Sequence, residues 1–347
     1  MKAAVWYAKE DIRVEYIDEP VVRPGKVKVK IAWTGICGSD LHAYHGHVVQ
    51  VNEPHPVSGE MAPLTLGHES SGFIVEVGEG VTGFTAGDRV AIEPMLRCGK
   101  CQSCKDGNPN LCDHIGFIGL HGNGTFAEYA IVDPYMLHKL PDHIEMDEAA
   151  LIEPTAVAFH AVKLSQQKVG DKVAVFGAGP IGLLTIISAK AAGASQIIAV
   201  DISSERLALA AKVGATAVID ATKEDAVQSI LANTGGVDVA YEAAGAASTV
   251  NNALASLRKQ GEVVIVSIIP NPIAIDINPL TIKEAKMTAT IGYRNVYPQV
   301  IDMIASGTMN VKQIITKKIP LDKIVEEGFQ TLITDKAQAK ILVELQA

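Results

Sequence analysis

Four cysteines at a short, regular spacing constrain this chain of 347 residues more than any other feature of its sequence. They are Cys98, Cys101, Cys104 and Cys112. Two residues separate neighbours among the first three and seven precede the last, in a segment rich in Gly, Asn and Pro. Four thiolates at this spacing can close around one tetrahedral zinc ion, with Zn–S distances of about 2.3 Å. A disulfide framework is disfavoured because the chain has only five cysteines and no segment typical of a secretory signal. The pattern therefore predicts a structural zinc site.

Composition and charge indicate a folded, two-domain protein. Apolar residues make up 48% of the chain and charged residues 20%, which is ordinary for a globular protein. The formal net charge is −9 without a long basic run, which disfavours a nucleic-acid or anionic-membrane partner. Residues 173–189 carry no charge, but the Gly and Pro within them favour a strand-turn-helix over a membrane span. We expect a reduced, cytoplasmic protein that acts on a small molecule.

Two sequence textures divide the chain. Short alternating runs such as KVKVKIAW, SGFIVEVG and DRVAIEP, bounded by Gly, Pro and Asp, predict a β-rich domain over residues 1–154 that includes the cysteine lobe. Over residues 155–291, strand-like apolar runs alternate with alanine-rich helical stretches, which predicts a parallel, doubly wound sheet. Residues 292–347 form a third segment, with helices expected at YPQVIDMIASG and LDKIVEEGFQTL and a last strand at AKILVELQ.

A glycine-rich turn in the second domain is typical of dinucleotide binding. It follows the apolar run of residues 173–176, opens a predicted helix and contains Gly177, Gly179, Pro180, Ile181 and Gly182. The first glycine permits a tight turn, the second lets the backbone approach a pyrophosphate, and the third lets helix and strand pack closely. The helix N-terminus then offers free N–H groups to the phosphates.

An acidic residue after the next strand indicates which dinucleotide binds. Asp201 ends the run IIAVD, where a carboxylate can accept a hydrogen bond from a ribose hydroxyl. Its negative charge would repel a 2′-phosphate, which favours NAD over NADP. Arg206 follows nearby, where it can flank the adenine or lie in solvent.

A second set of residues has the composition of a catalytic metal site. Cys37, His68 and a carboxylate from Glu69 or Glu153 would leave one position of a tetrahedral zinc ion open, as in catalytic sites. Each residue also has an ordinary structural explanation. An isolated Cys is usually a small buried hydrophobe, and most His and Glu side chains are simply solvated or hydrogen-bonded.

Several of these segments together resemble one known family. GICGSDLH, GHESSG, the four-cysteine run, LIEPTAVAFH and GAGPIG resemble, along the whole chain, the zinc-dependent medium-chain dehydrogenases. Within that family, HPVSGEMAPLTLGHE and GFIGLHGNGTFAEYA are most similar to the 2,3-butanediol (acetoin) dehydrogenase branch. The resemblance implies a GroES-like catalytic domain, a Rossmann domain and a C-terminal tail that returns to the catalytic domain. It also implies NAD and two zinc ions per chain, one structural and one catalytic, in a homodimer or homotetramer.

The resemblance assigns roles around the catalytic zinc. Cys37 and His68 correspond to zinc ligands, and Glu153 stands where alcohol dehydrogenases of the family have a second cysteine. That departure follows the polyol dehydrogenases and leaves open whether Glu69, Glu153 or each in turn completes the ligand set. Asp40 is expected to accept a hydrogen bond from the other nitrogen of His68.

The remaining family positions concern the proton and the cofactor. Ser39 and His42 match a proton relay that leads away from the substrate. Tyr44 is expected to line the substrate pocket, and Arg294 to reach the cofactor.

These roles predict reversible oxidation of a vicinal secondary alcohol, 2,3-butanediol to acetoin. The alternatives are a sorbitol-type polyol or L-threonine dehydrogenase, which would share every residue named, or a catalytically inactive NAD-binding protein.

Overall fold

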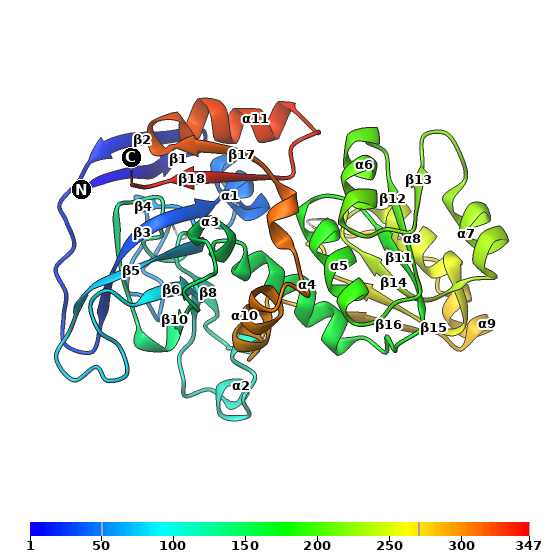
Figure 1. Ribbon diagram of the computed structural model, residues 1–347, viewed down its shortest axis with the longest axis horizontal. Coiled ribbons are helices and arrows are strands. Elements are labelled where there is room, and N and C mark those ends of the chain that lie inside the picture. The colour runs from blue at the N-terminus through cyan, green and yellow to red at the C-terminus, as the bar shows by residue number, and fades with distance from the viewer. Residues whose placement is uncertain (50, 270, 347) are drawn as a thin grey trace. The chain divides into compact units, whose positions relative to one another are not determined.

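The computed structural model describes residues 1–49, 51–269 and 271–346, and it divides into two compact units (Figure 1). The first, called here the catalytic unit, comprises Met1–Glu153, Tyr297–Ala305 and Ile315–Ala347. The second, the nucleotide unit, comprises Pro154–Val296 and Ser306–Ile314. No helix among the described residues is both long and apolar enough to cross a bilayer.

The catalytic unit is built mainly on antiparallel strands. Its largest sheet has the order β10-β6-β5-β3-β18-β17, and β9 also pairs with β3. These strands are β3 (Val27–Gly35), β5 (Glu69–Val77), β6 (Arg89–Ile92), β9 (Tyr129–Val132), β10 (Leu137–Lys139), β17 (Ile315–Pro320) and β18 (Lys340–Glu344). Two smaller sheets contain β1 (Lys2–Ala8), β2 (Asp11–Tyr16) and β4 (Leu64–Thr65), and β7 (Met95–Leu96) and β8 (Gly116–Phe117). Their apolar side chains alternate into one core, which includes Val29, Ile31 and Ile74.

The C-terminal strand places the end of the chain beside the first candidate metal ligand. Strand β18 pairs antiparallel with β3, with Leu342 opposite Gly35, and parallel with β17. The backbone N–H of Ile36 donates to the carbonyl of Ile341 at 3.0 Å. The segment that carries Cys37 is therefore fixed by a strand from the far end of the sequence.

Short helices complete the catalytic unit. They are α1 (Gly38–Tyr44), α2 (Gln102–Lys105), α3 (Met146–Ala149), α10 (Tyr297–Ala305) and α11 (Gln330–Thr334). Helix α4 (Ile152–Leu164) begins at the division between the units. The helix expected over LDKIVEEGFQTL is instead a 3-10 turn, a π-helical segment over Ile324–Phe329 and α11.

The nucleotide unit is the doubly wound domain that the strand-helix alternation predicts. Its six strands are parallel in the order β13-β12-β11-β14-β15-β16. They are β11 (Lys172–Phe176), β12 (Gln196–Asp201), β13 (Ala217–Asp220), β14 (Val237–Glu242), β15 (Leu257–Ile265) and β16 (Lys286–Ala289). The helices are α5 (Pro180–Ala191), α6 (Ser204–Val213), α7 (Ala226–Thr234), α8 (Ala247–Ser256) and α9 (Asn278–Lys283). Figure 1 shows α5 and α6 on one side of this sheet and α7, α8 and α9 on the other. The strand order reverses at β11, and ligands of such sheets bind at the carboxyl ends of the strands there.

The boundaries differ from the sequence pattern in two places. The pattern assigns residues 292–347 to one returning segment, whereas residues 292–296 and Ser306–Ile314 belong to the nucleotide unit. Met309 is fully buried there and its sulfur lies 4.0 Å from the Ser188 hydroxyl, so burial of this apolar side chain holds the segment. The helical pattern of ASTVNNALASLRK, one of the alanine-rich stretches, continues to Lys259, but α8 ends at Ser256 because Leu257 already pairs with Val237 as the first residue of β15.

Candidate active site

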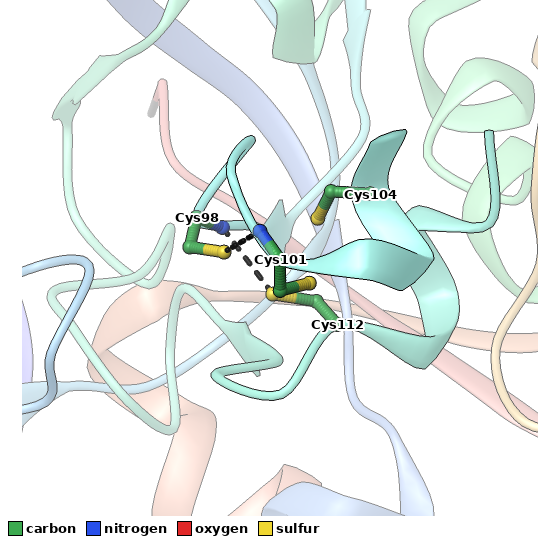
Figure 2. Close-up of side chains that lie close together, drawn as sticks. All are labelled: Cys98, Cys101, Cys104 and Cys112. Atoms are coloured by element: carbon green, nitrogen blue, oxygen red, sulfur yellow. Dashed lines mark hydrogen bonds between the residues drawn. The ribbon is translucent and has the colours of Figure 1, made fainter. Parts of the chain in front are cut away.

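The four cysteines of the lobe lie together, as their spacing predicts (Figure 2). The ligand atoms of Cys98, Cys101, Cys104 and Cys112 all lie within 4.8 Å of one another. Backbone N–H groups point at the sulfurs: Cys101 donates to Cys98 Sγ and Cys98 donates to Cys112 Sγ, each at 3.3 Å. The N–H groups of Lys100 and Cys101 lower the pKa of the Cys98 thiol to about 6, which favours its thiolate form. A closed, all-sulfur donor set of this kind fits zinc.

Cys37 and Asp40 are joined at the start of α1. Cys37 precedes the helix with extended backbone, and its N–H donates to Asp40 Oδ2 at 2.9 Å. Asp40 is fully buried, and its other oxygen accepts from the Gly67 N–H at 3.3 Å. One carboxylate therefore ties the backbone at Cys37 to the backbone next to His68.

His68 lies between an acidic and a polar partner. Its Nδ1 lies 3.5 Å from Asp40 Oδ1, and its Nε2 lies 3.1 Å from the Ser39 hydroxyl. Burial disfavours the imidazolium form of His68, but the negative charges of Asp40 and Cys37 outweigh burial and raise its pKa well above the usual value. The thiol of Cys37 also hydrogen-bonds to His68. The site thus has a strongly negative potential, which suits a cation.

Glu69 is bound by a buried lysine that the sequence did not indicate. Lys340 Nζ, from β18, donates to both carboxylate oxygens of Glu69 at 2.7 and 2.6 Å and to the Ile36 carbonyl at 3.0 Å. The exposed fraction is 0% for Glu69 and 1% for Lys340. Burial disfavours the Lys340 ammonium, yet the charges of Glu69 and Cys37 outweigh it and raise its pKa. No pattern marks Lys340, since a lysine on a strand is ordinarily solvated.

Glu153 differs from Glu69 in its surroundings. It lies in the first turn of α4 and is 6% exposed. Its charge acts on both His68 and Lys340, so it lies close to the same group of side chains. Among the described residues, the four cysteines are the one group of three or more potential metal ligands whose ligand atoms all lie within 4.8 Å of one another. The candidate ligands of the catalytic metal are therefore neighbours in the fold, but their ligand atoms do not converge as closely as those of the four cysteines. These candidates are Cys37, His68, Glu69 and Glu153.

The donor chemistry nevertheless fits a metal ion with an open position. Cys37 offers a thiolate, His68 an imidazole whose other nitrogen faces Asp40, and Glu153 a buried carboxylate. This combination of soft and borderline ligands suits zinc. An acidic group behind a histidine ligand is also the usual arrangement in zinc sites.

The other family positions of the catalytic unit lie on α1. Ser39 is half-buried against His68, and His42 lies exposed one turn later. The expectation that Tyr44 lines the substrate pocket stays a prediction, and the structure gives the contacts of this side chain. Tyr44 is 5% exposed within the hydrophobic core, where its ring packs 5.3 Å from that of Phe329 and its hydroxyl accepts from Gln330.

The glycine turn has the geometry that each glycine was expected to supply. Gly177 has φ +97°, and a Cβ there would lie 2.9 Å from Ala244. A Cβ on Gly182 would lie 1.8 Å from the Gly177 carbonyl oxygen, so only glycine allows this helix-strand approach. A Cβ on Gly179 would meet nothing within 4 Å. The backbone at Gly179 and Pro180, where α5 begins, is therefore open to a ligand, as a pyrophosphate site requires.

Asp201 lies at the carboxyl end of β12 and contacts the glycine turn. Its Oδ2 accepts from the Ala178 N–H at 2.6 Å, and its Oδ1 accepts from the N–H groups of Ile202 and Ser203. Its carboxylate is thus fixed beside the turn. Arg206 lies in the first turn of α6, where its N–H donates to the Ser203 hydroxyl.

Arg294 belongs to the same unit as the glycine turn. Arg294 acts electrostatically on His160. Burial has the largest effect on His160, and together with the positive charges of Arg294 and Lys163 it lowers the pKa of this histidine to about 4.

Ile181, the remaining residue of the glycine turn, lies in the first turn of α5 and is half-buried.

A doubly wound sheet with an open glycine turn, a half-buried thiol beside a buried imidazole and a separate four-cysteine lobe define a metal-dependent dehydrogenase. The comparisons with known proteins agree. A family model described as "Alcohol dehydrogenase GroES-like domain" matches residues 23–142, and one described as "Zinc-binding dehydrogenase" matches residues 180–306.

Curated and solved relatives match the chain over its whole length. The (R,R)-butanediol dehydrogenase of Bacillus subtilis is 48% identical, with 99% of each chain covered. The sorbitol dehydrogenase of the same organism is 36% identical, covering 99% of this chain and 97% of that protein. The crystal structure of 2R,3R-butanediol dehydrogenase from Bacillus subtilis superposes with a TM-score of 0.94, at 48% identity and 99% coverage of both chains. The chain therefore belongs to the zinc-dependent alcohol dehydrogenase family of oxidoreductases, with a GroES-like and a Rossmann-like domain.

Proposed function

We propose that this enzyme catalyses the reversible, NAD-dependent oxidation of 2,3-butanediol to acetoin. The observation that carries the proposal is the cluster of half-buried Cys37 with buried His68 and Asp40, found in a chain 48% identical over its full length to a butanediol dehydrogenase. When bound, zinc would stabilise the ionised substrate oxygen as a Lewis acid, and NAD would accept hydride from the carbinol carbon.

Cys37, His68 and Glu153 are the proposed ligands of the catalytic zinc. The ion pair with Lys340 occupies both oxygens of Glu69, which supports Glu153 as the carboxylate ligand. Asp40 orients the imidazole by facing its Nδ1, and it fixes the backbone at Cys37. The four cysteines hold a second, structural zinc, which gives two zinc ions per chain.

Ser39 and His42 are the proposed route for the substrate proton. A hydroxyl can accept and donate in the same step, and the Ser39 hydroxyl lies 3.1 Å from His68 Nε2, the nitrogen that zinc would take, so it lies next to the proposed metal position. His42 is exposed on the same helix, so its imidazole can pass the proton to solvent.

The dinucleotide is proposed to lie on the glycine turn. The open space at Gly179 and the N-terminus of α5 support the pyrophosphate position, and the fixed carboxylate of Asp201 supports NAD over NADP. Pro180, Ile181, Arg206 and Arg294 are proposed as additional cofactor contacts.

A homodimer or homotetramer is proposed, with the edge strand β16 in the interface. All four residues of β16 are exposed. Large exposed apolar side chains lie on this strand and in the segments that precede and follow it in sequence, namely Ile268, Ile277, Ile282, Met287 and Ile291. An unpaired apolar edge favours pairing with another chain. All five cysteines are unpaired, which supports a reducing, cytoplasmic location.

A sorbitol-type polyol dehydrogenase is the second candidate, because the Bacillus subtilis sorbitol dehydrogenase is 36% identical over nearly the whole chain. NADH formation should be measured with each isomer of 2,3-butanediol, with sorbitol and with L-threonine, before and after metal removal. The proposal expects metal-dependent turnover that is fastest with one butanediol isomer. Negligible butanediol turnover beside rapid sorbitol or threonine turnover would reassign the substrate. An absence of turnover with all of them, despite NADH binding, would favour an inactive NAD-binding protein.

A further inference from the structure

Glu242 is a buried carboxylate at the carboxyl end of β14, and neither the glycine motif nor the metal ligands account for it. It is 0% exposed. No lysine, arginine or histidine of the described chain forms an ion pair with it. A carboxylate without a cationic partner is costly to bury unless hydrogen bonds compensate for the lost water. The hydrogen-bond donors around Glu242 therefore show which segments of the fold its carboxylate holds together.

Four hydrogen bonds satisfy the Glu242 side chain. Oε1 accepts from the N–H groups of Ala244 and Gly245 at 2.9 and 2.8 Å and from the Thr249 hydroxyl at 2.6 Å. Oε2 accepts from the Ser267 hydroxyl. These donors come from the turn after β14, from the first turn of α8 and from the segment after β15. One carboxylate thus joins three segments at the carboxyl edge of the sheet.

The turn that Glu242 holds is packed against the glycine turn. The Ala243 N–H donates to the Phe176 carbonyl at 2.8 Å. A Cβ added to Gly177 would lie 2.9 Å from both the Cβ and the backbone nitrogen of Ala244, so the two turns touch. On its other side the glycine turn is held by Asp201, through the Ala178 N–H. The backbone that faces the open space at Gly179 is therefore supported from both sides by carboxylates.

We propose that Glu242 is a positioning residue for the dinucleotide. Its carboxylate holds residues 243–245 against Gly177, and this contact keeps the N–H groups at the start of α5 in place for the pyrophosphate. The inference rests on the proposed dinucleotide site but not on the identity of the alcohol. Because Glu242 acts through the turn, its loss weakens binding of the cofactor and leaves the metal ligands in place.

Glu262 offers a matched control within the same sheet. It is also buried, at 2% exposure, and its carboxylate accepts from the Gln166 N–H at 2.6 Å and from the Thr288 hydroxyl at 2.8 Å. In the strand register it lies beside Val239, three residues before Glu242 and away from the glycine turn. If Glu242 only stabilised the fold, its loss and the loss of Glu262 should have the same effect on the NADH Kd.

The test is NADH binding to the full-length, zinc-loaded protein, measured by fluorescence titration without substrate. Glu242→Gln keeps the side-chain shape but places an amide NH2 among donors, and it is expected to raise the NADH Kd about tenfold or more. The KM for NAD should rise by more than kcat falls, and zinc content should stay that of the wild type. Glu262→Gln should lower the melting temperature by about as much as Glu242→Gln does, but it should leave the NADH Kd unchanged. Glu242→Asp, which keeps the charge, should recover part of the affinity.

Two outcomes would overturn the inference. One is a folded Glu242→Gln variant that binds NADH as tightly as the wild type. The other is an equal loss of affinity in Glu262→Gln, which would indicate general destabilisation. If Glu242→Gln fails to fold, Thr249→Val and Ser267→Ala each remove one donor and should raise the Kd by a smaller factor, and an unchanged Kd in both would contradict the inference. NADH binding by the wild type without butanediol turnover would sink only the proposed substrate.

Discussion

Lys340 donates hydrogen bonds to both carboxylate oxygens of Glu69, from a distance of 271 residues along the chain. Both side chains are almost fully buried, and the same ammonium also binds the carbonyl of Ile36, the residue before Cys37. This ion pair connects the last strand of the chain to the segment that carries the candidate metal ligands. It also engages both oxygens of Glu69, which supports the proposal that Glu153 is the carboxylate ligand of the metal ion.

Replacing Lys340 with methionine should destabilise the enzyme strongly. Removing one partner leaves the Glu69 carboxylate buried without its counter-charge, which costs about 3–5 kcal/mol. Denaturant unfolding measures the change. The double variant Glu69→Gln, Lys340→Met should recover part of the loss, because no uncompensated charge is left.

Lys318 provides the matched surface control for this prediction. Its ammonium pairs with Asp147 at 2.5 Å, but its side chain is 46% exposed. Lys318→Met should therefore cost no more than about 1 kcal/mol. Equal losses in the two lysine variants would show that the burial of the Glu69–Lys340 pair has no energetic consequence.

The third zinc ligand can be assigned by comparing two conservative variants. Glu153→Gln should remove the zinc associated with Cys37 and His68 and abolish most activity, because a charged ligand is lost. Glu69→Gln should keep zinc near the wild-type content. Its metal affinity should fall by at most about 10–100-fold, which is typical when a residue that supports the ligands is changed. Zinc per chain is measured by elemental analysis after dialysis against a weak chelator. The reverse pattern would make Glu69 the ligand.

Replacing Cys104 with serine should release the other zinc. The four thiols of the lobe converge within 4.8 Å, and three thiolates with one weakly binding hydroxyl hold zinc poorly. The variant is expected to contain one zinc per chain instead of two and to melt at a lower temperature. Cofactor binding should persist, because the glycine turn belongs to the other unit. A variant that retains both zinc ions and the wild-type melting temperature would contradict a structural zinc in the lobe.

Ser39→Ala should slow turnover without removing metal. The Ser39 hydroxyl contacts His68 Nε2, and loss of general acid-base assistance lowers kcat by about 10²–10⁴-fold. Zinc content and the NADH Kd should stay unchanged, and turnover should regain speed at higher pH, where the substrate proton leaves without help. Ser58→Ala is a suitable control, since Ser58 donates to the His121 carbonyl in the same unit. A wild-type rate in Ser39→Ala would exclude the relay.

Local sequence patterns predicted the parts of the site that lie close together in the chain. The cysteine spacing and the glycine turn each follow from fewer than about twenty residues of sequence, where backbone geometry limits the choices. The alternation of strands and helices likewise predicted the parallel sheet, because crossover helices leave few topologies.

Contacts between distant segments were beyond such patterns. The pairing of β18 with β3 places Lys340 on Glu69, and nothing near either residue signals the other. Tyr44 follows the relay residues in sequence, yet its burial depends on Phe329 and Gln330. Glu242 became noticeable only when its four donors from three segments were located.

Cofactor preference should depend on Asp201 and not on its neighbour Asp220. The two residues are opposite each other in the register of β12 and β13, at the carboxyl edge of the sheet. The Lys223 ammonium, which lies 2.6 Å from Asp220, lowers the pKa of that carboxyl to about 2 and neutralises its charge locally. Among the described residues, the donors to the Asp201 carboxylate are the backbone N–H groups of Ala178, Ile202 and Ser203, so its charge remains to repel a 2′-phosphate.

Asp201→Asn should therefore lower the ratio of kcat/KM for NAD to kcat/KM for NADP by about tenfold or more, which corresponds to about 1.4 kcal/mol. The asparagine keeps an oxygen acceptor for the backbone N–H groups, so the turn should stay folded. Asp220→Asn should leave the ratio unchanged, because the pair that it breaks is already neutral. Steady-state kinetics with both cofactors measure the ratio. If the wild type uses NADP as well as NAD, or if both variants change the ratio equally, the carboxylate of Asp201 does not select the cofactor.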